Sequence, residues 1–262
     1  MSFLPQPLGG RPDALLARVS GVTRLTAGLL WLLAVVVTTQ PITPALLCLA
    51  AVVALVLWSG LDVGLVARRF GPVFVAALGL AAVAAVFSPL NADPSAAVVL
   101  DVGPLRVTVP ALSGALALGL RLVAIALTSV LVFGPGEITA LADSLVQQAH
   151  VPDRFAYGSV AALGLVPLLA ADWEATSIAR RLRGLDGGPW SGLTSLGGRL
   201  LTLLVSAIRR AGRMALAMDA RGFDSGRPRS RYRPVRLGPR DAVVVVVAAA
   251  VAALALLAAP GP

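Results

Sequence analysis

Two arginine-glycine elements are the residues of this sequence best suited to bind another protein. They are Leu182-Arg183-Gly184 and Ala220-Arg221-Gly222, and each ends a long, partly apolar helical pattern. A glycine just past a helix end accepts the left-handed conformation that closes the last turn. The arginine before it then projects from the helix tip, where its guanidinium can pair bidentately with a carboxylate. We expect two cationic tips suited to acidic grooves on a partner, although C-capping alone also produces such ends.

Composition places these tips in an integral membrane protein. Of the 262 residues, 57% are hydrophobic and only 13% are charged, whereas soluble domains carry about a quarter charged residues. All 22 basic residues are arginine, so the lysine of a phosphate-binding P-loop is missing and the chain does not hydrolyse ATP in that manner. The single Cys48 and single His150 exclude a disulfide framework or a Cys/His metal cluster within one chain.

Five apolar runs are predicted to cross the membrane, the first two slightly short of the ~20 residues that a span needs. They are residues 25–39, 45–60, 72–90, 111–133 and 241–259. Asp62, Arg68 and Arg69 are expected in a loop before the third run. Residues 91–110 are predicted to leave the membrane as an outer loop with a β-hairpin around Gly103-Pro104. In the third run, alanines repeat every four residues and offer a small-residue packing face: Ala77, Ala81 and Ala85.

The arginines set the predicted orientation. Residues 137–240 carry 15 of the 22 arginines, which the positive-inside tendency places in the cytoplasm. We therefore predict an all-α polytopic membrane protein with about five transmembrane helices and long amphipathic cytoplasmic helices. Its parts are a cytoplasmic N-terminus at 1–24, four transmembrane helices at 25–134, a cytoplasmic helical region at 135–240 and a C-terminal transmembrane helix at 241–262, whose end lies outside.

The cytoplasmic region is predicted to hold helices at 137–150, 153–183 and 191–223, with Asp153 as an N-cap. Apolar residues 155–171 are not expected to cross, because the following helix has only nine apolar residues, Leu200–Ile208, between its arginines. Such helices would lie along the bilayer surface. A basic loop after them is expected to contact anionic lipid headgroups through Arg227, Arg229, Arg231 and Arg233.

Arg121 stands in the middle of the fourth predicted span. An arginine at mid-bilayer is costly and usually faces the bundle interior, a cavity or a partner. Two kinds of interpretation are open from the sequence: an intramembrane contact with functional or partner significance, or else simple snorkelling or a helix that enters obliquely.

The residues around both tips resemble the T component of energy-coupling factor transporters, a family that includes the permease subunit of cobalt importers. Segments 179–186 and 217–223 match the paired X-Arg-X motifs of that family, and the second match is the more specific. The resemblance extends to the outer hairpin, the Arg121 helix and Trp173-Glu174.

Two positions depart from the family pattern. Leu182 stands where alanine is commoner in the first motif, and the N-terminal basic motif is reduced to Thr23-Arg24-Leu25. Neither departure removes an arginine of the pair. Both therefore affect the assignment to a subfamily more than the assignment to the family.

The resemblance implies a non-catalytic energy-coupling subunit of an ABC-type importer for a vitamin or transition-metal ion, in a prokaryotic cell membrane. T components sit between two cytoplasmic ATPases, which bind ATP and magnesium, and a small membrane protein that captures the substrate. Arg183 and Arg221 would then dock the ATPases, with Gly184, Ala220 and Gly222 shaping the tips. The long cytoplasmic helices become coupling helices, whose apolar faces at 155–171 and 200–218 slide against the capture protein. The resemblance implies no cofactor in this chain and no nucleic-acid partner.

Other function classes remain as alternatives. A membrane-embedded enzyme is disfavoured because the interiors of the apolar runs lack carboxylates and histidine. A secondary transporter needs polar groups at the midplane, where Arg121 is the only charged candidate. A lipid-bound scaffold without ATPase partners is the third alternative, since basic helices also bind anionic membranes.

Overall fold

The computed structural model describes residues 14–38, 40–93, 95–102, 105–184, 191–223, 225, 231 and 233–258. These residues form two compact units. The bundle comprises the described residues of 6–149 and 235–262, and the helix pair comprises those of 150–234. Arg227 and Arg229 of the predicted basic loop lie outside the described residues.

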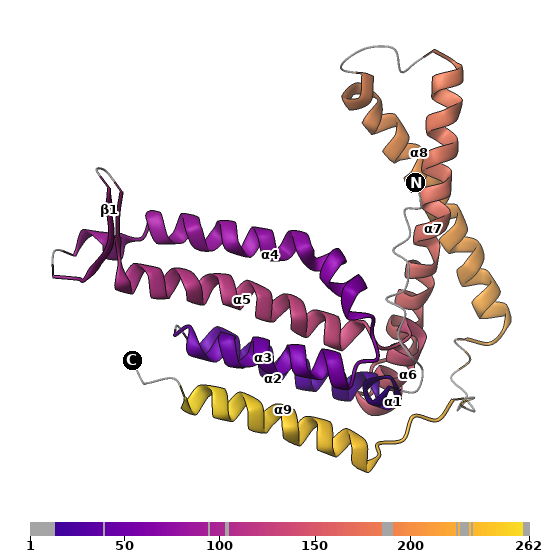
Figure 1. Cartoon of the computed structure of the whole chain (residues 1–262). Coiled ribbons are helices and arrows are strands. Elements are labelled where there is room, and N and C mark those ends of the chain that lie inside the picture. The colour runs from indigo at the N-terminus through magenta and orange to yellow at the C-terminus, as the bar shows by residue number, and fades with distance from the viewer. Residues whose placement is uncertain are drawn as a thin grey trace. The chain divides into compact units, whose positions relative to one another are not determined.

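Helices dominate both units, which confirms the all-α polytopic class (Figure 1). The long helices of the bundle are α2 (Gly21–Val37), α3 (Ile42–Leu57), α4 (Val63–Val86), α5 (Val109–Phe133) and α9 (Pro239–Leu257). Its shorter elements are α1 (Leu15–Arg18), η1 (Pro89–Ala92), β1 (Val98–Val102), β2 (Leu105–Thr108) and α6 (Ile138–Gln148). The helix pair consists of α7 (Asp153–Leu182) and α8 (Ser191–Ala220).

Several helices are long and apolar enough to cross a membrane. Within the described chain these are α4 with its continuation to Ala92, α5, α7 and α9. The helices α2 and α3 are apolar but shorter, with 17 and 16 residues. The chain is therefore a multi-pass membrane protein. Length and composition do not distinguish α7 from a span, so its location along the cytoplasmic surface stays a prediction.

Polar side chains in the bundle bond mainly to backbone groups of neighbouring helices. Three hydrogen bonds, 2.9 to 3.0 Å long, tie α9 to α2 and α3: Ser20 N–H to the Asp241 carboxylate, Trp31 Nε1 to the Ala248 carbonyl, and Thr43 Oγ1 to the Ala255 carbonyl. Along α2 and α9 the paired residue numbers rise together, so these two helices run parallel and begin at the same end. Each bond satisfies a donor that would be costly to bury alone.

Small residues let α4 and α5 approach closely, as the alanine repeat predicts. A Cβ on Gly119 of α5 would lie 3.1 Å from Ala81 Cβ and 3.2 Å from the Ala77 carbonyl. Ala77 and Ala85 are both buried. Close backbone approach through small residues is the usual way in which membrane helices pack.

The predicted outer hairpin is present, with β1 and β2 paired antiparallel. Asn91 anchors it to the helices. Its Nδ2 donates to the carbonyls of Ala85 and Val86 at the end of α4, and its Oδ1 accepts the Thr108 N–H at 2.9 Å. Thr108 is fully buried and caps α5 by accepting the Ala111 N–H.

The predicted loop before the third span is wrong in its extent. Asp62 caps the start of α4 by accepting the Gly64 N–H at 2.9 Å, so the helix begins at Val63 and includes Arg68 and Arg69. Pro72 therefore lies inside α4, where neighbouring structure tolerates it. Figure 1 shows α4 bending in its N-terminal part, as expected of an internal proline.

Two other helix starts differ from prediction. The helix α2 begins at Gly21, because Ser20 caps it by accepting the Thr23 N–H, and Arg24 is consequently a buried helical residue. Asp153 is the first residue of α7 instead of its N-cap, and Pro152 occupies the cap position. His150 does follow a helix end, as expected, with a positive φ of 55° after α6.

Arg121 makes an intramolecular contact at the end of α2. Its Nη2 donates to the carbonyl of Thr38, the residue that ends the helix, while its Nε has no hydrogen-bond partner among the described residues. A cation at a helix C-terminus complements the partial negative charge of the last carbonyls. Arg121 thus caps the C-terminal end of the short helix α2, and this contact within the bundle holds its side chain in place.

Candidate functional site

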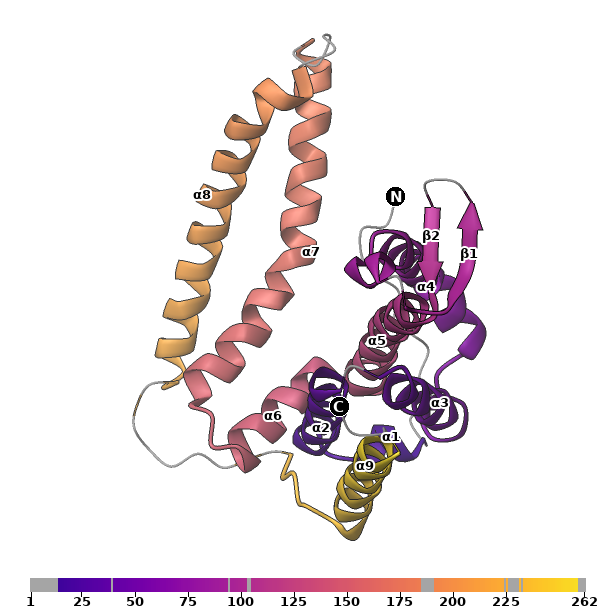
Figure 2. The same ribbon diagram turned by 90° about the vertical axis from the view of Figure 1, so that its left-hand side faces the viewer.

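The two arginine tips belong to long helices that run in opposite directions. Figure 2 shows α7 and α8 along their full lengths. Each has 30 residues, and α7 continues through Pro167 as one helix, as the sequence predicts. Near the start of α7, Tyr157 contacts Phe223, which follows the end of α8. Farther along α7, Trp173 contacts Arg199, which lies in the first half of α8. The helix pair is therefore antiparallel.

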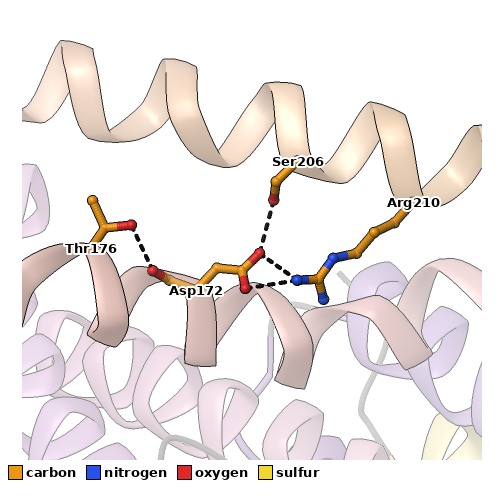
Figure 3. Close-up of polar contacts among 4 residues, drawn as sticks. All are labelled: Asp172, Thr176, Ser206 and Arg210. Carbon is orange, nitrogen blue, oxygen red and sulfur yellow. Dashed lines mark hydrogen bonds and ion pairs between the residues drawn. The ribbon is translucent and has the colours of Figure 1, made fainter.

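A polar clasp joins the two helices near their middle (Figure 3). Arg210 Nη2 on α8 donates to both carboxylate oxygens of Asp172 on α7, at 2.7 and 2.8 Å. Ser206 Oγ donates to Asp172 Oδ2 at 2.9 Å. The Thr176 hydroxyl, on the same helix as Asp172, donates to the Asp172 backbone carbonyl at 2.8 Å. The Asp172 carboxylate thus accepts three hydrogen bonds from α8, which fix where the helices cross.

Two aromatic contacts support the clasp on either side. The Arg199 guanidinium lies 5.5 Å from the centroid of the Trp173 ring, within the range of a cation–π interaction. The rings of Tyr157 and Phe223 are 6.4 Å apart and meet edge to face at 83°, an arrangement that aromatic pairs favour. Ala156 is the one buried residue of α7.

The second arginine tip ends in a Schellman motif. Gly222 has a φ of +75°. The Gly222 N–H donates to the Asp219 carbonyl at 2.8 Å, and the Phe223 N–H donates to the Met218 carbonyl at 3.0 Å. These two bonds define the motif and satisfy carbonyls at the helix end. Arg221 occupies the cap position, so the closed backbone turn sets where its side chain leaves the helix end.

The first arginine tip has the same local geometry. Arg183 is the C-cap of α7, and Gly184 follows with a φ of +70°. The Gly184 N–H donates to the Arg181 carbonyl at 3.0 Å. No described atom would lie within 4 Å of a Cβ on Gly184, so the left-handed backbone, not crowding, requires glycine here. The predicted left-handed glycines are confirmed at both tips.

The two tips lie at opposite ends of the helix pair. Arg221 follows α8 beside Tyr157, near the start of α7, whereas Arg183 follows the end of α7. From Tyr157 to Arg183 the chain advances 26 residues, and a rise of about 1.5 Å per residue places the tips about 40 Å apart. One small partner could not contact both tips at once. The geometry suits two separate sockets.

Both guanidinium groups are open to a partner. Arg183 and Arg221 are exposed, and neither side chain has a hydrogen bond or ion pair with any part of the chain that the structure describes. Ala220 is exposed beside Arg221. Leu182, the departure from the commoner alanine, is 84% exposed. In chemical terms, each tip is an exposed cation next to a small or apolar side chain, which fits an acidic groove.

The helix pair also exposes large apolar side chains. On α7 these include Phe155 at 72% exposure and Val166 at 52%, and on α8 Leu201 at 62% and Ile208 at 62%. Extensive exposed apolar surface marks a contact with protein or membrane. The predicted apolar faces at 155–171 and 200–218 are therefore available for such a contact.

The structure adds residues that the sequence did not single out. These are Asp172 on α7 and its partners Ser206 and Arg210 on α8. The available signal was a carboxylate, Asp172, where the apolar half of α7 gives way to its charged half. Arg231 and Arg233, the described part of the basic loop, are exposed. Within the described ranges, no three His, Cys, Asp or Glu side chains gather as a metal site.

Comparison with known proteins gives a family match over most of the chain. The cobalt transport protein family, CbiQ, matches residues 13–232. The energy-coupling factor transporter transmembrane protein EcfT of Leuconostoc gelidum subsp. gasicomitatum is 31% identical over 150 residues, covering 53% of this chain and 56% of that protein. The EcfT of Listeria innocua serovar 6a is 28% identical over 168 residues, covering 60% and 63%.

A third relative, the EcfT of Heliobacterium modesticaldum, is 35% identical over 101 residues, covering 37% of this chain and 38% of that protein. Each of these matches spans less than two thirds of the relative's own length. The family match covers the hairpin, α5, both long helices and both arginine tips. With its paired arginine ends and multi-pass bundle, the chain belongs to the CbiQ/EcfT family of transmembrane components of energy-coupling transporters.

Proposed function

We propose that this chain couples ATP hydrolysis by two cytoplasmic ATPase subunits to a small membrane protein that captures the substrate. The observation that carries the proposal is the pair of exposed arginines, Arg183 and Arg221, each set by a left-handed glycine at opposite ends of one helix pair. Two cationic helix ends about 40 Å apart match two sockets better than one. The chain has no lysine, and a P-loop requires one. We therefore assign ATP and magnesium binding to the partner ATPases.

The helix pair can transmit motion between these partners. When the ATPases close on ATP, the sockets approach and carry the tips with them. Because α7 and α8 cross at the clasp of Asp172 and Arg210, displacement of either tip turns its helix about that crossing. The exposed apolar faces of both helices then shift against the capture protein and favour release of its substrate inward.

The substrate and the orientation are further parts of the proposal. We assign import of a vitamin or a transition-metal ion, with specificity residing in the capture protein. We place the N-terminus and the helix pair in the cytoplasm of a prokaryotic cell and the C-terminus outside, because 15 of 22 arginines fall within 137–240. The described arginines of the basic loop, Arg231 and Arg233, then face anionic lipid.

Charge reversal at both tips tests the docking roles. We expect an Arg183→Glu/Arg221→Glu variant, co-expressed with the ATPase pair from the same organism, to lose co-purification of the ATPases and to stop uptake. The matched control is Arg213→Glu, which reverses an exposed arginine within α8 and away from both tips.

A lipid-bound scaffold makes the opposite prediction. If arginines act only by attracting anionic lipid, each reversal contributes similarly, and Arg213→Glu or Arg227→Glu should matter as much as a tip. Wild-type amounts of complex and of uptake in the double variant would contradict ATPase docking.

A further inference from the structure

The chain leaves the bundle after α6 and returns to it before α9, and a hydrogen bond joins these two places. The first stretch of the bundle ends at Ala149, and the second begins at Val235. The backbone N–H of Val235 donates to Oε1 of Gln147, in the last turn of α6, at 2.9 Å. We call this bond the latch, because it holds the returning chain against the end of the outgoing helix.

The helix α6, which carries Gln147, is packed firmly into the bundle. A Cβ on Gly21 of α2 would lie 2.6 Å from Ser144 Oγ, so α2 and α6 touch closely (Figure 2). The hydroxyl of Ser20 donates to Oε1 of Gln148 at 2.9 Å. Gln148 thus bonds to the start of α2, whereas its neighbour Gln147 bonds to the returning chain.

The start of α9 is fixed at the same junction. The carboxylate of Asp241 is buried and accepts the Ser20 N–H at 2.9 Å and the Gly238 N–H at 2.8 Å. Hydrogen bonds from N–H groups to a carboxylate are among the stronger ones in proteins. Ser20 therefore ties α9 to α6 through Gln148, and the latch ties the chain that precedes α9 to the same helix.

The two connections to the helix pair are unequal. Residues 149–152 form the short one, in which the positive φ of His150 and the ring of Pro152 restrict the backbone. Residues 221–238 form the long one. Without the latch, the long connection would meet the bundle only at the start of α9. The latch brings that attachment to the end of α6, across residues 235–238, which can extend for up to about 14 Å.

We propose that Gln147 is a positioning residue that gives the helix pair a single pivot on the bundle. Both connections then stay together at the end of α6 through the transport cycle. A lever transmits a displacement fully only when its pivot stays in place. Loss of the latch should therefore let the ATPase movement shift the helix pair instead of turning it. This role rests on the proposed function, whereas the joining of the two connections does not.

Four variants separate the latch from the rest of the junction. Gln147→Leu removes the acceptor, and Val235→Pro removes the donor N–H. Gln147→Glu keeps an acceptor oxygen at the same reach. Gln148→Leu is the matched control, because it breaks the neighbouring bond to Ser20, whose hydroxyl keeps Thr23 as a partner. Each variant is co-expressed with its partner subunits and reconstituted into proteoliposomes, where ATP hydrolysis and uptake are measured together with hydrogen exchange.

We expect the Val235 amide to exchange about fivefold faster in Gln147→Leu, the factor that one neutral hydrogen bond contributes to such an equilibrium. Uptake per ATP hydrolysed should fall by up to the same factor in Gln147→Leu and in Val235→Pro, and the double variant should lose no more than either. Gln147→Glu and Gln148→Leu should keep the wild-type ratio. Co-purification of the ATPases should be unchanged in all variants, because both arginine tips remain intact.

Reversible cross-linking tests whether the connections stay together. In a Cys48→Ala background, Gln147→Cys and Val235→Cys are combined and joined by a short bis-methanethiosulfonate reagent, which reduction removes. Before cross-linking, this variant lacks the latch and should show low uptake per ATP. The cross-link should restore the ratio of the Cys48→Ala protein, and reduction should lower it again.

Several results would overturn the proposal. Loss of uptake on cross-linking would mean that the connections separate during the cycle. Additive losses in the double variant, or an unchanged uptake per ATP in Gln147→Leu, would mean that the latch does not set the pivot. If the wild type binds no ATPase, the proposed function itself fails. The latch is then judged by hydrogen exchange alone, and equal rates at Val235 in wild type and Gln147→Leu would contradict it.

Discussion

The bundle and the helix pair are both built from apolar helices and both expose large apolar side chains, but the buried apolar core of the described structure lies in the bundle. In the bundle, Val35, Leu47 and Ala51 are at most 1% exposed, and polar side chains reach across to backbone carbonyls. In α7 a single residue, Ala156, is buried, and the contacts that join α7 to α8 include the polar clasp and two aromatic contacts. The bundle can thus serve as a fixed platform, while the helix pair keeps surface for partners and freedom to turn.

Glycines show the same difference at the level of single atoms. A Cβ on Gly28 of α2 would lie 2.4 Å from Val132 Cγ2, whereas a Cβ on Gly212 of α8 would meet no described atom within 4 Å. The glycine in the bundle permits close packing. The glycine in the helix pair faces open space and only weakens its helix.

The largest expected effect comes from filling the tight position. Gly28→Leu should destabilise the bundle by about 1–3 kcal/mol, because the added carbons overpack the contact with α5. Gly212→Leu should be neutral or stabilising by up to about 1 kcal/mol, since leucine favours the helix. Thermal unfolding in detergent measures both. Similar losses in the two variants would contradict the contrast between the units.

A smaller effect is expected at the second tip. Gly222→Ala forces a residue with a Cβ to keep a φ of +75°, at a cost of about 1–2 kcal/mol. The Schellman turn should open, and hydrogen exchange at the amides of Gly222 and Phe223 should accelerate while the bundle stays protected. Gly197→Ala, inside α8, is the control, and protection of both amides in Gly222→Ala would show that the turn does not need glycine.

The clasp is expected to contribute modestly to stability and strongly to coupling. The Asp172 and Arg210 side chains are 28% and 27% exposed, so solvent weakens their attraction, and Asp172→Asn should cost at most about 1 kcal/mol. Uptake should fall further than ATPase co-purification, because the tips remain intact. A double-mutant cycle with Arg210→Gln measures the pair, and simple additivity would mean that the clasp carries no coupling energy.

The smallest effect is expected at the cation–π contact. Trp173→Leu keeps an apolar side chain of helical propensity but removes the ring under Arg199, at a cost of about 0.5–1 kcal/mol for a half-buried pair. Arg199→Gln should cost less in that background than in the wild type, because the shared contact is already lost. Losses that simply add would show that the two side chains do not stabilise each other.

The sequence predicted much of this structure because its strongest signals are local. Hydropathy located α5 and α9, turn chemistry located the outer hairpin, and glycine identified both helix ends. Those features depend on neighbours in the chain. The boundary of α4 was missed because Asp62 caps it ten residues before Pro72, and internal proline is tolerated among membrane helices.

Contacts between distant residues could not be read in the same way. Nothing local pairs Asp172 with Ser206 and Arg210, which are 34 and 38 positions away. Likewise, the role of Arg121 depends on α2 ending level with the middle of α5, a consequence of helix lengths and packing that only three dimensions reveal.

The most direct test of the central claim is cross-linking beside each tip. Leu182 and Ala220 precede the two arginines and are exposed, and the chain has one cysteine to remove, Cys48. In a Cys48→Ala background, Leu182→Cys and Ala220→Cys should each cross-link to an ATPase subunit in membranes, whereas Ala211→Cys within α8 should not. Cross-linking of neither tip to an ATPase, or equal cross-linking of Ala211→Cys, would contradict docking by two arginine helix ends.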